Sequence, residues 1–144
     1  LQQLGLGLSF LTSFTWQYAF DVLLSSEEFG LGGSQLVRAY DPSEITGDNG
    51  TAIKMELQKG IKTDWSYLKS FQSYLYFDHG TVAIRNSTAV QKSSDSLTST
   101  GLGVRANVNE WLSGYLEVGQ PLSGDVNAEG NSDPRFFFSL NARY

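Results

Sequence analysis

The chain has 144 residues, a formal net charge of −5 and no cysteine. This length fits about one domain, and the lack of cysteine excludes a disulfide framework and a cysteine metal site. The acidic balance, without a basic cluster, argues against a nucleic-acid-binding protein. No apolar run approaches about 18 residues, so the sequence also excludes a transmembrane helix.

The first segment alternates apolar and polar residues from Leu4 to Phe20, with only Thr12 breaking the apolar row. Successive side chains of a strand point to opposite faces, so this pattern predicts a strand with one apolar face. A strand that crosses a bilayer needs about 9–11 residues, whereas strands of soluble proteins average about 5–6. The length favours a membrane β-barrel, and a soluble β-sandwich is the alternative.

The same alternation predicts further strands at residues 51–61, 65–78, 97–109, 111–122 and 134–144. The connections between strands are in turn long, short, long, short and long, with the long ones at residues 29–50, 79–96 and 123–133. Outer-membrane barrels alternate short periplasmic turns with longer extracellular loops. We therefore predict an all-β, antiparallel transmembrane β-barrel fold.

The number of predicted strands is too small for a closed barrel. About six strands are predicted, and closed membrane barrels need about eight or more because an open edge in lipid leaves unpaired backbone groups. The chain starts at Leu1 without an initiating Met and without a signal peptide. We therefore expect the C-terminal portion of a larger barrel, which aggregates without its other strands.

The connection at residues 30–50 is long and rich in glycine. Arg38 stands in it among apolar residues, and the loop closes with Gly47, Asp48, Asn49 and Gly50. Long ordered loops in β-proteins are commonly functional. We predict that this loop folds back into the barrel and places Arg38 on partners inside; an exposed surface loop is the alternative.

These residues resemble a known family. The loop motif and strand ends are similar to those of the outer-membrane protein 85 superfamily, and most of all to two-partner secretion transporters of the haemolysin secretion/activation type. The family tetrapeptide is Val-Arg-Gly-Tyr/Phe, and Ala39 replaces its glycine here. The residues that carry the resemblance are Gly32, Gly33, Val37, Arg38, Ala39, Tyr40, Gly47, Asp48, Gly50, Glu56 and the strand end Phe77-Asp78-His79-Gly80.

The resemblance implies a position and partners for the loop. The chain would form the last six or so strands of a barrel of about sixteen, without the periplasmic POTRA domains and the N-terminal strands. Arg38 would be held in the lumen by Glu56 and Asp78, both of which fall on the polar face of their strands. A planar guanidinium suits carboxylates bidentately. In the alternative, the two carboxylates only solvate the lumen wall.

The last strand ends on an aromatic residue, as in many bacterial outer-membrane proteins. The resemblance implies that the barrel-assembly machinery reads this end. The residues of this terminal signal are Phe136, Phe138, Leu140 and Tyr144.

Other chemistry fits the sequence poorly. His79 is the only histidine, and its place suggests a loop role, so no Ser-His-acid set and no enzyme are expected. Asp41, Glu44 and Asp48 do not match the calcium-loop spacing, and we interpret them as solvated loop acids. We expect no metal and no cofactor.

The resemblance also implies a function. The complete protein would lie in a Gram-negative outer membrane, contact its lipid, and translocate an unfolded partner exoprotein without ATP. A barrel-assembly factor of the same superfamily is the runner-up, and a soluble β-sandwich binding module is the alternative from another class.

Overall fold

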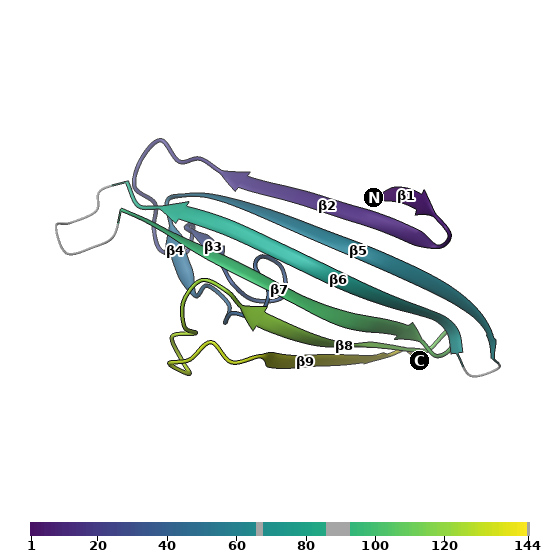
Figure 1. Cartoon of the computed structure of the whole chain (residues 1–144). Coiled ribbons are helices and arrows are strands. Elements are labelled where there is room, and N and C mark those ends of the chain that lie inside the picture. The colour runs from purple at the N-terminus through teal and green to yellow at the C-terminus, as the bar shows by residue number, and fades with distance from the viewer. Residues whose placement is uncertain (66–67, 86–92, 144) are drawn as a thin grey trace.

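The computed structural model describes residues 1–65, 68–85 and 93–143, and within these ranges the chain consists of strands and connections (Figure 1). One antiparallel seven-stranded sheet has the order β1-β2-β5-β6-β7-β8-β9, and β3 and β4 form a second, two-stranded sheet. The predicted all-β antiparallel fold is confirmed. The strands are β1 Gln2–Gly5, β2 Leu8–Gln17, β3 Phe29–Leu31, β4 Ile45–Gly47, β5 Asn49–Trp65, β6 Leu68–Ala83, β7 Ser94–Asn107, β8 Leu112–Pro121 and β9 Arg135–Ala142.

The large sheet has two chemically different faces. Large apolar side chains stand exposed on its outer face, among them Leu75 at 57% and Phe138 at 80%. On the inner face, side chains of the opposite parity are buried, including Glu56 and Asp78. Exposed apolar residues and buried charged residues are the reverse of the arrangement in a soluble protein. The alternation of side chains along each strand separates the two kinds of residue onto the two faces.

The long connections lie at one end of the sheet and the close connections at the other (Figure 1). Residues 18–48 and 122–134 join strands at the first end, and residues 6–7 and 108–111 join strands at the second. Among the connections that lie wholly in the described ranges, short and long ones therefore occur at opposite ends of the sheet, as predicted.

The prediction of a single first strand from Leu4 to Phe20 is wrong. Its beginning folds into a hairpin, because Gly5 and Gly7 adopt φ values of 87° and 76° around Leu6. These glycines fit the polar positions of a strand equally well, but positive φ is typical of tight turns. The sheet accordingly contains seven strands rather than six.

The long connection predicted at residues 79–96 is also shorter than expected. β6 continues to Ala83 and β7 begins at Ser94. The strands extend because Thr81 pairs with Ser96 and Val82 with Asp95 in register. The Ser/Thr-rich composition suggested a loop, but pairing with a neighbouring strand overrides composition.

The sheet does not close on itself. Among the described strands, β1 pairs only with β2 and β9 only with β8. We call the seven-stranded sheet the wall. The two-stranded sheet lies against its inner face and is too small to form the second layer of a sandwich, so the alternative of a β-sandwich is wrong. The described ranges contain no helix with the length and apolarity needed to span a membrane.

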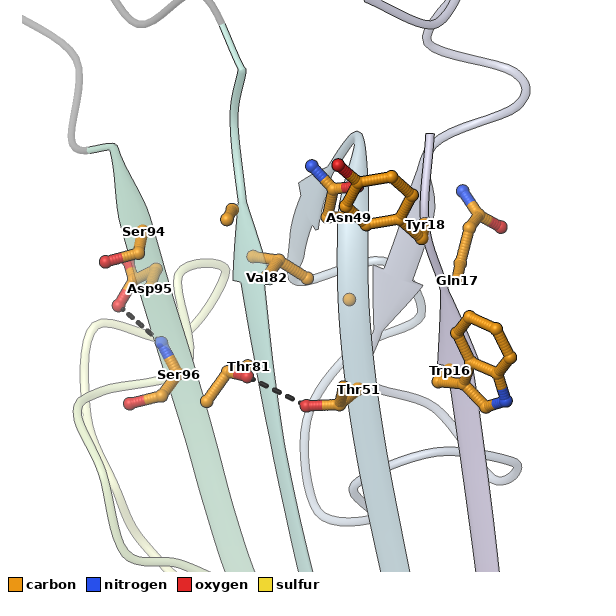
Figure 2. A pocket seen from close by; sticks show the side chains of 12 residues that line it. Trp16, Gln17, Tyr18, Asn49, Thr51, Thr81, Val82, Ser94, Asp95 and Ser96 are labelled. Carbon is orange, nitrogen blue, oxygen red and sulfur yellow. Dashed lines mark hydrogen bonds between the residues drawn. The ribbon is translucent and has the colours of Figure 1, made fainter. Parts of the chain in front are cut away.

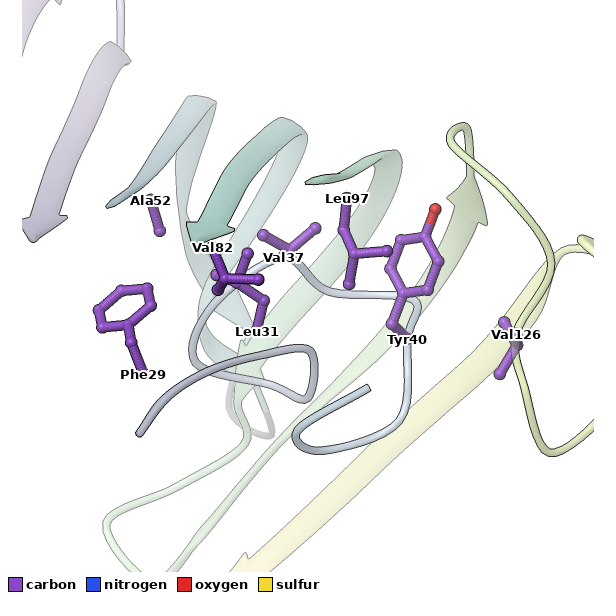
Figure 3. Packing of buried hydrophobic residues seen from close by; sticks show 8 residues of the cluster. All are labelled: Phe29, Leu31, Val37, Tyr40, Ala52, Val82, Leu97 and Val126. Atoms are coloured by element: carbon purple, nitrogen blue, oxygen red, sulfur yellow. The ribbon is translucent and has the colours of Figure 1, made fainter. Parts of the chain in front are cut away.

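The segment from β3 to β4 folds over the inner face of the wall. Leu31 and Val37 are fully buried, and they pack with inward-facing residues of the wall strands (Figure 3). Each fully buried side chain of this size contributes about 1.5–3 kcal/mol. The apolar core therefore fixes the loop against the wall. Its members are Phe29, Leu31, Val37, Tyr40, Ala52, Val82, Leu97 and Val126.

Candidate functional site

The loop backbone turns sharply to aim Arg38 at the wall. Gly32 has a φ of 109°, and a Cβ there would lie 2.0 Å from the carbonyl oxygen of Asp41. The backbone N–H of Gly33 donates to the carbonyl of Tyr40 at 3.0 Å and closes the turn. These contacts explain the Gly32-Gly33 pair of the motif.

The residues on either side of Arg38 adopt a conformation that side chains disfavour. Val37 has a φ of 55° and Ala39 a φ of 75°. For a residue with a Cβ, the left-handed region costs about 1–2 kcal/mol. Ala39 thus stands where the family motif has glycine and where a glycine would relieve this cost.

Arg38 is bound bidentately by Asp78 of β6. Its Nε donates to Oδ2 at 2.7 Å and its Nη2 to Oδ1 at 2.9 Å, while its own backbone N–H donates to Oδ2 at 3.1 Å. The side chain of Asp78 is completely buried and that of Arg38 is 6% exposed. Burial alone would lower the pKa of Arg38, but the bonds and charges of Asp78, Glu56 and Glu117 raise its pKa above the ordinary value.

Two further carboxylates of the wall complete the Arg38 site. Nη1 of Arg38 lies 2.5 Å from Oε1 of Glu56 on β5 and 3.4 Å from Oε2 of Glu117 on β8. The ring of Tyr76 lies under the guanidinium, 3.7 Å from ring centroid to Cζ. Arg38 is thus held by β5, β6 and β8 together, and its removal would leave the buried Asp78 without its bidentate partner.

A second arginine joins the same network. Arg105 of β7 donates from Nη1 and Nη2 to the two oxygens of Glu56, both at 3.1 Å. Its guanidinium lies 3.8 Å from the centroid of the Tyr74 ring, and the Tyr74 hydroxyl donates to Oε2 of Glu117 at 2.7 Å. The network therefore runs in a ring from Arg38 through Glu56, Arg105, Tyr74 and Glu117 back to Arg38.

Two glycines of β7 make room for the rings beneath the arginines. A Cβ at Gly101 would lie 2.5 Å from Cε1 of Tyr76, and one at Gly103 would lie 2.4 Å from Cζ of Tyr74. Real Cβ atoms do not approach a ring so closely, so any side chain there would displace the tyrosine. The alternation of glycine in this strand thus has a steric cause.

The Arg38 site borders a polar cavity of about 230 Å³ on the inner side of the wall. Both arginines, Lys54 and Tyr115 contribute to its lining. Among the described residues, no group of three or more His, Cys, Asp or Glu side chains is arranged to hold a metal ion.

The end of the loop is anchored by Asp48. Its Oδ1 accepts the N–H of Leu23 at 2.6 Å and its Oδ2 that of Arg85 at 2.8 Å. These two backbone donors lower the pKa of Asp48 below its ordinary value. Gly50, the last residue of the motif, lies under the ring of Phe29, where a Cβ would be 2.1 Å from Cδ1. A Cβ at Gly47 would lie 2.9 Å from the carbonyl oxygen of Ala83.

The interpretation of the loop acids as solvated is wrong. Asp41 forms an ion pair with Arg135 at 2.7 Å, and Glu44 accepts the N–H of Asn127 at 2.6 Å. Asp48 is buried as well as bonded. These partners lie far away along the chain, so composition around the acids gave no sign of them.

Tyr40 and the connection at residues 122–134 hold the loop from the other side. The Tyr40 hydroxyl donates to the carbonyl of Thr98 at 3.1 Å and accepts the N–H of Ser123 at 3.1 Å. Val126, from the same connection, is fully buried in the core.

The remaining candidates lie away from the Arg38 site. Phe136, Phe138 and Leu140 stand 71–80% exposed on the outer face of β9, and Tyr144 lies outside the described residues. The prediction that His79 lies in a loop is wrong, because it belongs to β6, where its Nδ1 is 2.8 Å from the Thr98 hydroxyl.

A wider hollow of about 610 Å³ occurs at the loop end of the wall (Figure 2). Trp16 and Tyr18 lie on one side of it, and the hydroxyls of Thr51 and Thr81 are 3.0 Å apart between neighbouring strands. Neither arginine of the inner network lines it.

Glu117, Arg105, Tyr74 and Tyr76 were not predicted as members of the Arg38 network. Alternation along their strands places Tyr74 and Tyr76 on the same face as Asp78, but it does not show which strands lie side by side. Counting parity along residues 111–122 would have placed Glu117 on the same face as Tyr115 and Gly119.

The chain matches one family model over residues 2–106, a range that includes the loop, β5, β6 and most of β7. No curated protein and no solved structure matches the chain. The matched model describes the haemolysin secretion/activation protein ShlB/FhaC/HecB. The chain therefore belongs to this family of two-partner secretion transporters of the outer-membrane protein 85 type.

Proposed function

We propose that the complete protein containing this chain is a two-partner secretion pore in the outer membrane of a Gram-negative bacterium. It moves an unfolded partner exoprotein through its lumen without ATP, a cofactor or a catalytic step. The observation that carries the proposal is the burial of Arg38 against carboxylates of β5, β6 and β8, in a chain of the two-partner secretion family.

The two faces of the wall support a membrane position. The exposed apolar side chains of the outer face contact lipid, and the buried polar network faces the lumen. The free edges at β1 and β9 pair with further strands of the complete barrel, because unpaired backbone groups are costly in a bilayer. The exposed outer residues of β9 are presented to the barrel-assembly machinery during insertion.

The loop that carries Arg38 braces the lumen and sets the conformation of the pore. Its apolar core residues hold it against the wall, and Arg38 adds a buried, fully paired charge. Removing one partner of such a pair costs about 3–5 kcal/mol. The loop is therefore held firmly in one position, and a change in these contacts alters the path of the exoprotein.

The test is Arg38→Ala in the full-length gene, with the partner exoprotein at the cell surface as readout. We expect secretion to be lost or strongly reduced while some transporter remains inserted in the membrane. Arg143→Ala, at an exposed arginine after β9, is the matched control and keeps normal secretion. Unchanged secretion in Arg38→Ala would overturn the proposed role of the loop.

A further inference from the structure

Glu56 is shared by two arginines that belong to different parts of the molecule. Arg38 comes from the loop and donates to Oε1 at 2.5 Å. Arg105 comes from the wall and donates to both oxygens at 3.1 Å. With its side chain only 3% exposed, Glu56 depends on such partners to remain charged in the interior.

The contacts of Arg105 do not involve the loop. It binds Glu56 of β5, its Nη1 donates to Oε1 of Gln72 on β6 at 3.2 Å, and it stacks on Tyr74 of β6. Gly103 leaves the space that the Tyr74 ring occupies. Within the described part of the chain, Arg105 is therefore held in place by residues of the wall strands β5 and β6.

The charges of the site are balanced only when the wall cations are included. Asp78, Glu56 and Glu117 face Arg38 and Arg105. Lys54, directly opposite Asp78 in the strand register, lines the same cavity. Without Arg38, the wall still holds two cations beside its carboxylates, and one of them is already bidentate on Glu56.

We propose that Arg105 is a positioning residue that keeps Glu56 paired when the Arg38 loop leaves the wall. It lowers the cost of loop withdrawal, because the buried carboxylate is not left without a cation. The inference rests on the proposed function, in which the Arg38 contacts hold the loop against the wall, and it adds that the loop can be withdrawn from this position. In this proposal, Arg105 of the wall eases withdrawal of the loop, whereas Arg38 holds the loop against the wall.

The first test is a stability cycle on the full-length protein in detergent, which does not depend on secretion. Arg38→Gln, Arg105→Gln and the double variant are compared by the temperature at which the folded, heat-modifiable form is lost. Since the two arginines substitute for each other at Glu56, the double variant is expected to lose more than the sum of the single losses. Adding Glu56→Gln to the double variant is expected to recover most of the difference.

A double variant no less stable than Arg38→Gln alone would overturn the proposal, since Arg105 would then act only through Arg38. Failure of Glu56→Gln to restore stability would overturn it as well. Arg143→Gln combined with Arg38→Gln is the additive control. If the double variant does not fold, Arg38→Gln with Arg105→Lys replaces it, and the retained charge is expected to restore folding; no restoration counts against the proposal.

The second test measures loop withdrawal directly. The chain contains no cysteine. The substitution Val37→Cys at this buried position, in a cysteine-free full-length protein, therefore reports when the loop leaves the wall. Arg105→Gln is expected to slow labelling of this cysteine by about fivefold or more. A residue that only braced the site would give the opposite result, faster labelling, and that outcome would overturn the proposal. Normal secretion in Arg38→Ala would instead contradict the proposed function and leave the stability cycle valid.

Discussion

The outer and inner faces of the wall differ in which side chains they expose and which they bury. On the outer face, apolar side chains such as Leu75 and Phe138 are exposed. On the inner face, Asp78 and Glu56 are buried and each has defined partners. The outer face therefore requires only hydrophobicity, whereas the inner face requires particular residues at particular positions.

The largest effect is expected from removing the carboxylate of Asp78 on the inner face. Asp78→Ala leaves Arg38 buried without its bidentate partner, and we expect a loss of about 3–5 kcal/mol in the free energy of unfolding. Denaturant unfolding of the full-length protein in detergent measures it. Asp125→Ala, at an exposed loop acid, is the control with little change. A similarly small loss in Asp78→Ala would contradict the view that the buried pair stabilises the loop.

The second-largest effect is expected from a charged substitution on the outer face, at the middle of β6. Leu75→Arg places a charge where the account has lipid, and we expect a cost of about 2–4 kcal/mol near the bilayer midplane. Refolding into lipid vesicles measures it, with Leu75→Ile as the control that keeps the apolar surface. Equal stability of the arginine and isoleucine variants would show that this face does not contact lipid.

Two neighbouring tyrosines of the inner face, Tyr74 and Tyr76, differ in whether their hydroxyls are hydrogen-bonded. The Tyr74 hydroxyl donates to Glu117, whereas the buried Tyr76 hydroxyl has no hydrogen-bond partner within the described part of the chain. Tyr74→Phe is expected to cost about 1.5–3 kcal/mol, as for other bonds to charged groups, and Tyr76→Phe close to nothing. Thermal unfolding of both variants checks this difference, and equal losses would count against the network.

The smallest effect is a gain. Ala39→Gly relieves the positive φ of residue 39 and is expected to raise stability by about 1 kcal/mol. Ala52→Gly, at a buried strand residue, is the control and is expected to lower stability by about 0.5–1 kcal/mol. A loss in both variants would show that Ala39 is not strained.

The sequence predicted the outer face well because its signal is local. Alternation along each strand determines which residues point outward, and no knowledge of neighbouring strands is needed. The same alternation placed Glu56 and Asp78 inward. The alternation gave a wrong prediction at Gly5 and Gly7, because glycine fits a tight turn as well as a polar position of a strand.

The partners on the inner face could not be predicted from alternation, because they depend on register between strands. Arg105 reaches Glu56 across β6, and Glu117 reaches Arg38 only because β8 lies beside β7. A shift of one residue would turn every side chain of a strand to the other face. The resemblance to a family supplied the Arg38 pairing with Glu56 and Asp78 but not these further members.

The most direct test of the central claim is a charge exchange between the loop and the wall. Arg38→Glu is made alone and together with Asp78→Arg in the full-length gene, and partner exoprotein at the surface is measured. We predict loss of secretion in the single variant and recovery in the double, because the exchanged pair restores opposite charges across the same contact. Loss in both variants, with both inserted in the membrane, would contradict the claim that this ion pair sets the conformation of the pore.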